Sequence, residues 1–90
     1  MLKFTKQTLK KAELLLEDVG YIVRYEKGNF QSGYCLLQDR KVVIVNKFFE
    51  TEARINALLD IIQAVEINAE LLSDKSRKFY KRIQPTEKEE

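Results

Sequence analysis

Hydrophobic positions in the first twenty residues recur at the spacing of an α-helix. They lie three or four residues apart and share one helical face: Leu9, Ala12, Leu16 and Val19. Thr5 can cap the start of this helix, because its hydroxyl can accept a hydrogen bond from a free backbone N–H. Gly20 can end it in the left-handed conformation. The pattern therefore predicts one helix between Thr5 and Gly20.

The charges of this first helix run against its dipole. Lysines lie near its start and acids near its end: Lys6, Lys10, Lys11, Glu13, Glu17 and Asp18. Each exposed charge placed in this way costs roughly a few tenths of a kcal/mol. We therefore expect tertiary packing, rather than local electrostatics, to hold the helix.

Three runs typical of β-strands follow, separated by short spacers: YIVRYE (residues 21–26), NFQSGYCLLQ (29–38) and KVVIVN (41–46). Spacers this short favour antiparallel pairing of consecutive strands. The second spacer, Asp39-Arg40, lacks the glycine of the favoured two-residue hairpin turn. Because residues 42–45 are apolar on both faces of their strand, we expect both faces of the sheet to be covered there.

The last part of the chain carries an apolar stripe at alternating steps of three and four residues. Glu50 and Glu52 suit a helix start, and Thr51 can cap it. The stripe is Ile55, Leu58, Ile62, Val65, Ala69, Leu72, Ser76, Phe79 and Ile83, of which only Ser76 is not apolar. A continuous helix over residues 52–82 would be about 45 Å long. It would overshoot a globule of this chain length, which is about 25 Å across.

A broken helix is the alternative to this long one. Ser73 would then cap a separate short helix that starts at Asp74, and the two alternatives stay open at this point. The sequence predicts an α+β fold with a three-stranded antiparallel sheet, one N-terminal helix and a long C-terminal helix, continuous or broken. We expect a single domain over residues 1–83 and a charged flexible tail over residues 84–90.

The composition excludes most catalytic chemistries. The 90 residues contain no histidine and one cysteine, which removes the commonest general base and the commonest metal ligand. We therefore expect no enzyme activity, no catalytic or metal site and no cofactor. The longest apolar runs, residues 14–16 and 42–45, are far too short to cross a membrane. With no signal-peptide pattern and a single cysteine, the sequence favours a cytoplasmic protein.

The stretch GNFQSGYC, residues 28–35, contains the single cysteine and two of the three glycines. We interpret Cys35 as a small buried hydrophobe of the core, because a reactive thiol needs a cation or a helix N-terminus nearby. The alternative is a groove for a small ligand or peptide, lined by Phe30, Tyr34, Asn46 and Lys47.

Two resemblances concern the segment from Glu26 to Ile62. Its GNFxxGxC strand, and the Asn-Lys that follows a β-branched strand before a helix, resemble a group of small uncharacterised bacterial proteins without an assigned activity. More distantly, this strand and helix resemble the scaffold of the ImmA/IrrE-type zinc metallopeptidases. Here the helix carries Asp60, Ile61 and Ala64 in place of a His-Glu-x-x-His motif, so the resemblance implies no peptidase activity.

The functional prediction is a non-enzymatic interaction protein that forms a homodimer through its C-terminal helix. A continuous helix would leave four apolar residues beyond the globule: Ala69, Leu72, Phe79 and Ile83. The alternative is weak nucleic-acid binding through residues 75–82, where five basic residues stand against Asp74 in the segment 74–82. The contacts would come from Lys75, Arg77, Lys78, Lys81 and Arg82 on phosphates, with Phe79 and Tyr80 stacked on bases.

Overall fold

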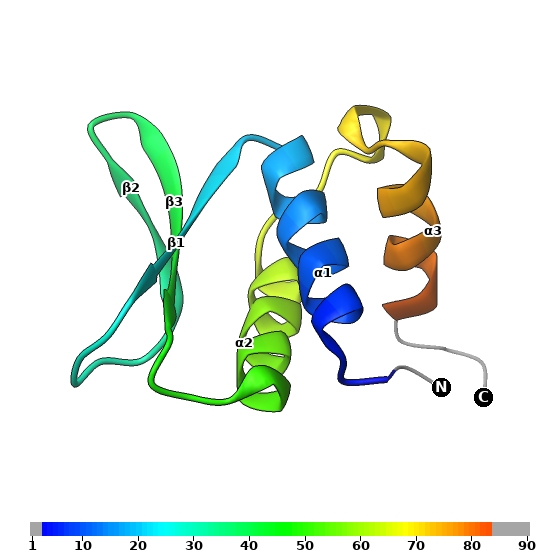
Figure 1. Cartoon of the computed structure of the whole chain (residues 1–90). Coiled ribbons are helices and arrows are strands. Elements are labelled where there is room, and N and C mark those ends of the chain that lie inside the picture. The colour runs from blue at the N-terminus through cyan, green and yellow to red at the C-terminus, as the bar shows by residue number, and fades with distance from the viewer. Residues whose placement is uncertain (1–2, 84–90) are drawn as a thin grey trace, which may run out of the picture.

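The computed structural model describes residues 3–83 and has an α+β fold in three layers (Figure 1). A three-stranded sheet forms one layer, two helices cover one of its faces, and a third helix packs on the far side of the first. The elements are α1 (Lys6–Asp18), β1 (Tyr21–Glu26), β2 (Gly33–Leu37), β3 (Arg40–Asn46), α2 (Thr51–Ala64), the 3-10 turn η1 (Ala69–Leu71) and α3 (Asp74–Ile83).

Helix α1 begins and ends as its sequence predicts. The Thr5 hydroxyl accepts a hydrogen bond from the Thr8 backbone N–H, and Gly20 has a φ of +95° after the last turn. Lys41 of β3 donates to the Val19 carbonyl oxygen at 3.3 Å. A cation from the sheet therefore lies at the C-terminal end of a helix whose own last turn contains no basic residue.

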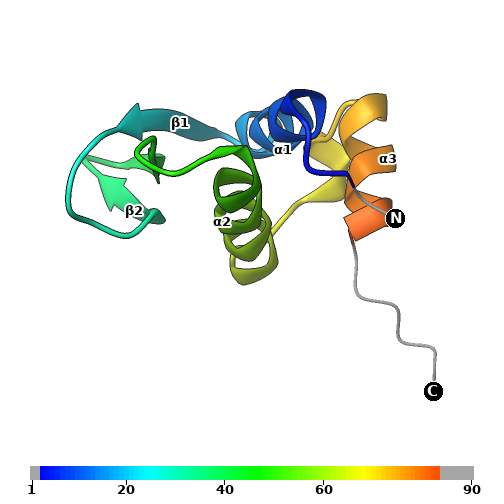
Figure 2. The same cartoon turned by 60° about the horizontal axis from the view of Figure 1, so that its bottom comes forward.

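The sheet is mixed, with strand order β1-β3-β2, so the prediction of a fully antiparallel sheet is wrong. Strand β2 pairs with β3 in antiparallel fashion, but β1 pairs with β3 in parallel. The spacer after β1 carries the chain across the end of β3 (Figure 2). Asn46 holds this crossing, because its side-chain NH₂ donates to the Gly28 and Phe30 carbonyl oxygens, both at 2.8 Å.

The hairpin between β2 and β3 turns at Gln38 and Asp39. Their φ values are +50° and +67°, so both residues adopt the left-handed conformation of a two-residue turn that usually contains glycine. The turn lies one residue earlier than the sequence predicts.

Within residues 3–83, the helices α1 and α2 cover one face of the sheet. Val43 and Val45 point into the core that α1 and α2 complete. Val42 is buried on the opposite face, where it lies between its paired neighbours Ile22 and Cys35. The expectation that both faces of the sheet are covered near residues 42–45 is therefore met at Val42 itself, although no helix of the described chain packs on that face.

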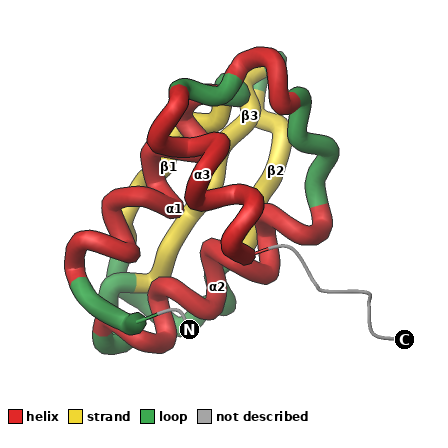
Figure 3. The backbone as a smooth tube through the Cα atoms, turned by 90° about the vertical axis from the view of Figure 1, so that its right-hand side faces the viewer, coloured by secondary structure: helices red, strands yellow, loops and turns green. Residues whose placement is uncertain are grey.

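The C-terminal half is broken and folds back, so the continuous helix does not exist. Helix α2 ends at Ala64, residues 65–73 form a connection that includes η1, and α3 runs antiparallel to α1 (Figure 3). Ser73 caps α3 as the alternative predicted: its hydroxyl accepts from the Ser76 N–H at 3.3 Å. Thr51 does not cap α2 but is its first helical residue, and Glu50 before it makes no side-chain cap.

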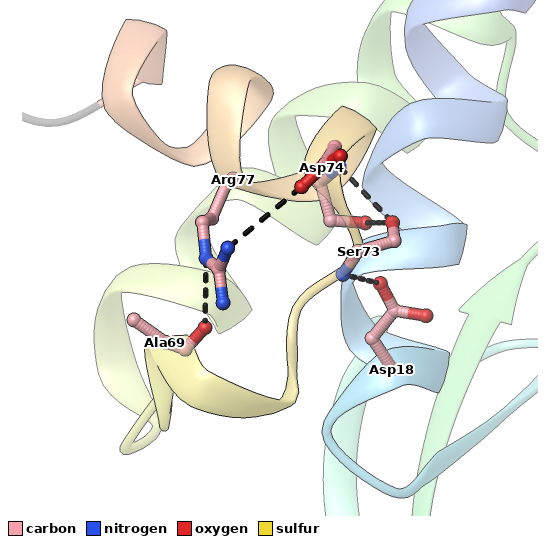
Figure 4. Close-up of polar contacts among 6 residues, drawn as sticks. Asp18, Ala69, Ser73, Asp74 and Arg77 are labelled. Carbon is pink, nitrogen blue, oxygen red and sulfur yellow. Dashed lines mark hydrogen bonds and ion pairs between the residues drawn. The ribbon is translucent and has the colours of Figure 1, made fainter.

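The corner before α3 is tied to α1 by one hydrogen bond. The Asp18 carboxylate accepts from the Ser73 backbone N–H at 2.9 Å (Figure 4). In the same corner, Arg77 donates to the Ala69 carbonyl oxygen at 3.3 Å and lies 3.8 Å from the Asp74 carboxylate. The negative charge of Asp18 is unfavourable at the C-terminal end of its own helix α1, but it is favourable at the N-terminal end of α3.

Burial raises the pKa of Asp18, but hydrogen bonds from Ser73 and Ser76 outweigh it and hold this pKa below its ordinary value of 3.8. A lowered folded-state pKa contributes stability that is present at neutral pH and lost as the pH falls through that pKa. We expect Asp18→Asn to lower the free energy of unfolding by about 1 kcal/mol or less at pH 7, because Asp18 remains partly exposed to solvent, which screens its charge. The difference should shrink in urea titrations as the pH falls below about 4, where the carboxyl group begins to be protonated.

Asp74→Asn is the matched control, because the Asp74 side chain is almost fully exposed. Its effect on the free energy of unfolding should be smaller at pH 7. An Asp18→Asn effect that does not change with pH would contradict a role for the Asp18 charge.

The charged tail predicted for residues 84–90 lies outside the described residues. Within residues 3–83, the longest stretch of helix is 14 residues, and none of the helices is long and apolar enough to span a membrane.

Candidate nucleic-acid interface

A basic groove runs between the antiparallel helices α1 and α3. Its volume is about 560 Å³. Helix α1 contributes Gln7, Lys10, Lys11 and Leu14, and α3 contributes Lys75, Ser76, Lys78, Phe79 and Arg82. Of its two apolar members, Phe79 is only 2% exposed and belongs to the hydrophobic core, whereas Leu14 is 37% exposed.

Five cations line this groove, and none of its lining residues is an acid. Within residues 3–83 the ion pairs are Arg24–Glu26 and Arg77–Asp74. The groove cations are therefore not neutralised by a carboxylate of the described chain. Like charges held close together repel, and a bound anion would relieve that repulsion.

The structure brings together only part of the predicted nucleic-acid contacts. Lys75, Lys78 and Arg82 line the groove. Arg77 and Lys81 instead border a smaller hollow of about 240 Å³ that also includes Asp74.

The prediction that Phe79 stacks on a base is wrong. Phe79 is buried in the core, and the partly buried Tyr80 also packs against that core. The Phe79 ring is therefore not available for stacking on a base. Ser76 and Phe79 are the buried residues of α3, and the groove cations Lys75, Lys78 and Arg82 lie beside them in the helix.

Lys10 and Lys11 were missed as candidate site residues. The sequence did contain a signal for them. Lysines in the first half of α1 oppose the helix dipole and reduce the stability of the helix, so their placement calls for another explanation, such as a binding role. The packing of α3 beside α1 gives these two lysines a common surface with Lys75 and Lys78.

The residues predicted for self-association do not form an exposed surface. Leu72 and Phe79 are buried in the chain's own core, and Ile83 packs against it. Ala69 is exposed in η1. The argument for a dimer through this stripe required a continuous helix and therefore does not hold.

The predicted ligand groove is not assembled either. Asn46 is buried, and its side chain is used in hydrogen bonds within the chain. Its NH₂ donates to the Gly28 and Phe30 carbonyl oxygens, and its Oδ1 accepts from the Phe48 N–H at 3.1 Å. Of the four predicted residues, only Tyr34 lines the hollow of about 660 Å³ between the start of β2 and helix α2. Phe30 lies beside Gly28, and Lys47 is exposed outside the hollow.

Cys35 is exposed on the open face of β2, so its interpretation as a core residue is wrong. No three Cys, Asp or Glu side chains gather as a metal site within residues 3–83. Burial, followed by the hydrogen bond to Glu13, raises the pKa of Tyr25 far above its usual range. This phenol therefore stays protonated and links β1 to α1.

Comparison of the chain with protein-family models, with curated proteins and with solved structures gives no match.

Proposed function

We propose that the protein is a non-enzymatic nucleic-acid-binding protein whose α1–α3 groove holds one strand of a duplex backbone. The observation that carries the proposal is the convergence of five cations from two helices on a groove without an acid among its lining residues. Lys and Arg side chains so placed can each neutralise a phosphate and release counterions.

The chemistry of the groove favours phosphate contacts over recognition of bases. Its neutral polar members are Gln7 and the buried Ser76, too few to read a sequence of base edges. Single-strand binding commonly uses exposed aromatic rings as stacking platforms, and the one aromatic residue of the groove, Phe79, is buried. We therefore propose binding to duplex DNA or RNA with little dependence on base sequence.

Fluorescence anisotropy of a labelled duplex, measured between about 50 and 200 mM salt, tests this function. Five phosphate contacts would give a log–log slope of about −4.5, which corresponds to an affinity loss of about 500-fold over that range. Lys10→Gln with Lys78→Gln removes two of the contacts. We expect this double variant to bind more weakly at about 50 mM salt and to reduce the slope by about 1.8.

The control is Lys27→Gln with Lys47→Gln, which removes the same charge from exposed positions outside the groove. It should lower affinity far less. Equal effects of the two double variants would show that net charge, and not the groove, binds the duplex. No binding at about 50 mM salt, or binding to anionic lipid vesicles but not to duplex, would reject the proposal.

A further inference from the structure

Strand β2 is an edge of the sheet, and the segment around it carries no charge. The order β1-β3-β2 leaves its outer side without a partner strand in the described chain (Figure 1). Residues 28–38 contain no Lys, Arg, Asp or Glu. Natural proteins usually protect an edge strand with charge, proline or a bulge. The opposite edge, β1, has such protection, because Arg24 and Glu26 are exposed on it.

Large apolar side chains are exposed along β2. Leu36 is 67% exposed, and Tyr34 and Leu37 are each 49% exposed. Tyr34 and Leu36 lie on the face of the sheet that carries Val43, while Leu37 lies on the other face with Gly33 and Cys35. Covering these three side chains would remove apolar surface from water, which favours association.

Strand β2 is complementary to a second copy of itself. In an antiparallel pair with Cys35 opposite Cys35, Tyr34 lies opposite Leu36 in both halves, which gives two aromatic–aliphatic cross-strand pairs. The same register places Leu37 opposite Gly33. No atom lies within 4 Å of the position that a Gly33 Cβ would take, so space is open there for the leucine.

We propose that two copies of the chain associate through antiparallel pairing of their β2 edges and form a continuous six-stranded sheet. A second copy of the chain fits this edge best. Its own β2, running in the antiparallel direction, is also uncharged, and it places Leu37 opposite the open space at Gly33. Two-fold dimers are also the commonest assembly. The interface lies at the sheet, whereas α3 lies on the far side of α1 (Figure 1), so the basic groove stays accessible in each protomer.

Cys35 reports directly on this register. Residues directly opposite in an antiparallel pair have Cα atoms about 4.5 or 5.5 Å apart, and both distances allow a disulfide. We expect diamide, which takes two electrons and two protons from two thiols, to convert the protein rapidly into a disulfide-linked dimer. Without oxidant, light scattering at micromolar concentration should give twice the 10.6 kDa chain mass.

Leu36→Lys supplies a charged edge at an exposed position, so the variant should fold normally and give the mass of one chain. The control Ile22→Lys changes an exposed residue of β1 and should leave the dimer intact. In a Cys35→Ser background, Tyr34→Cys and Leu36→Cys should cross-link with each other when mixed and much less with themselves.

A wild-type mass of one chain up to about 100 μM would overturn the proposal, and so would a Leu36→Lys variant that stays dimeric. Cross-linking of the position-34 variant with itself as fast as with the position-36 variant would overturn the register. None of these results depends on duplex binding, so the two proposals can fail separately.

Discussion

Phe79→Ala is expected to lower the free energy of unfolding by about 3–5 kcal/mol, the range found when a buried phenylalanine is truncated. Phe79 is buried in the core where α3 packs on α1, and its removal leaves a cavity that the surrounding backbone can fill only in part. A small domain has a total stability of about 5–15 kcal/mol. Urea denaturation followed by circular dichroism should therefore show a marginally stable protein.

Leu71→Ala is the control, because Leu71 is an exposed apolar residue of the neighbouring η1 turn. It should change the free energy of unfolding by about 0.5 kcal/mol or less. A Phe79→Ala effect below about 1 kcal/mol would contradict the packing of α3 on α1. A folded Phe79→Asp variant would contradict it as well, because a buried unpaired carboxylate is not tolerated in such a core.

Asn46→Ala is expected to cost about 2–4 kcal/mol of unfolding free energy. The Asn46 amide holds the Gly28 and Phe30 carbonyl oxygens and the Phe48 N–H, and each buried group left without a partner costs about 1–3 kcal/mol. We place the total below the simple sum because these contacts are only partly buried. Urea denaturation measures the loss, and hydrogen exchange should show that residues 27–32 become less protected.

Asn29→Ala tests whether the effect belongs to the Asn46 side chain or to any asparagine in this region. Asn29 lies in the same crossing segment and is exposed. Its replacement should change stability by about 0.5 kcal/mol or less. Equal losses from the two variants would argue against the role of Asn46 as the residue that holds the crossing.

The helices could be predicted from the sequence because their signals are local. The spacing of Leu9 and Leu16, the hydroxyl of Thr5 and the glycine at position 20 all act within a few residues of the helix they define. The break before α3 was harder to predict. The apolar stripe from Ile55 to Ile83 keeps its helical period through residues 65–73. The sequence pattern therefore supports a helix cap at Ser73 about as well as it supports a continuous helix.

Strand order could not be predicted because it depends on a side chain distant in sequence. The spacer after β1 has the length of a long hairpin loop, but Asn46, sixteen and eighteen residues further along, holds it across the end of β3. The candidate site was only half predictable for a similar reason. The cations of α3 stand together in the sequence, whereas Lys10 and Lys11 join them only through the packing of two helices.

The position of α1 between the sheet and α3 also constrains the order in which a growing chain can fold. Translation delivers α1 first and α3 last among the described elements, so α1 has no partner on its outer side until Phe79 has been synthesised. The sheet, α1 and α2 can assemble earlier, and they then expose the apolar surface of α1 that α3 later covers. Partly folded chains with such surfaces are prone to aggregate. The risk ends when α3 has been synthesised and packs on α1.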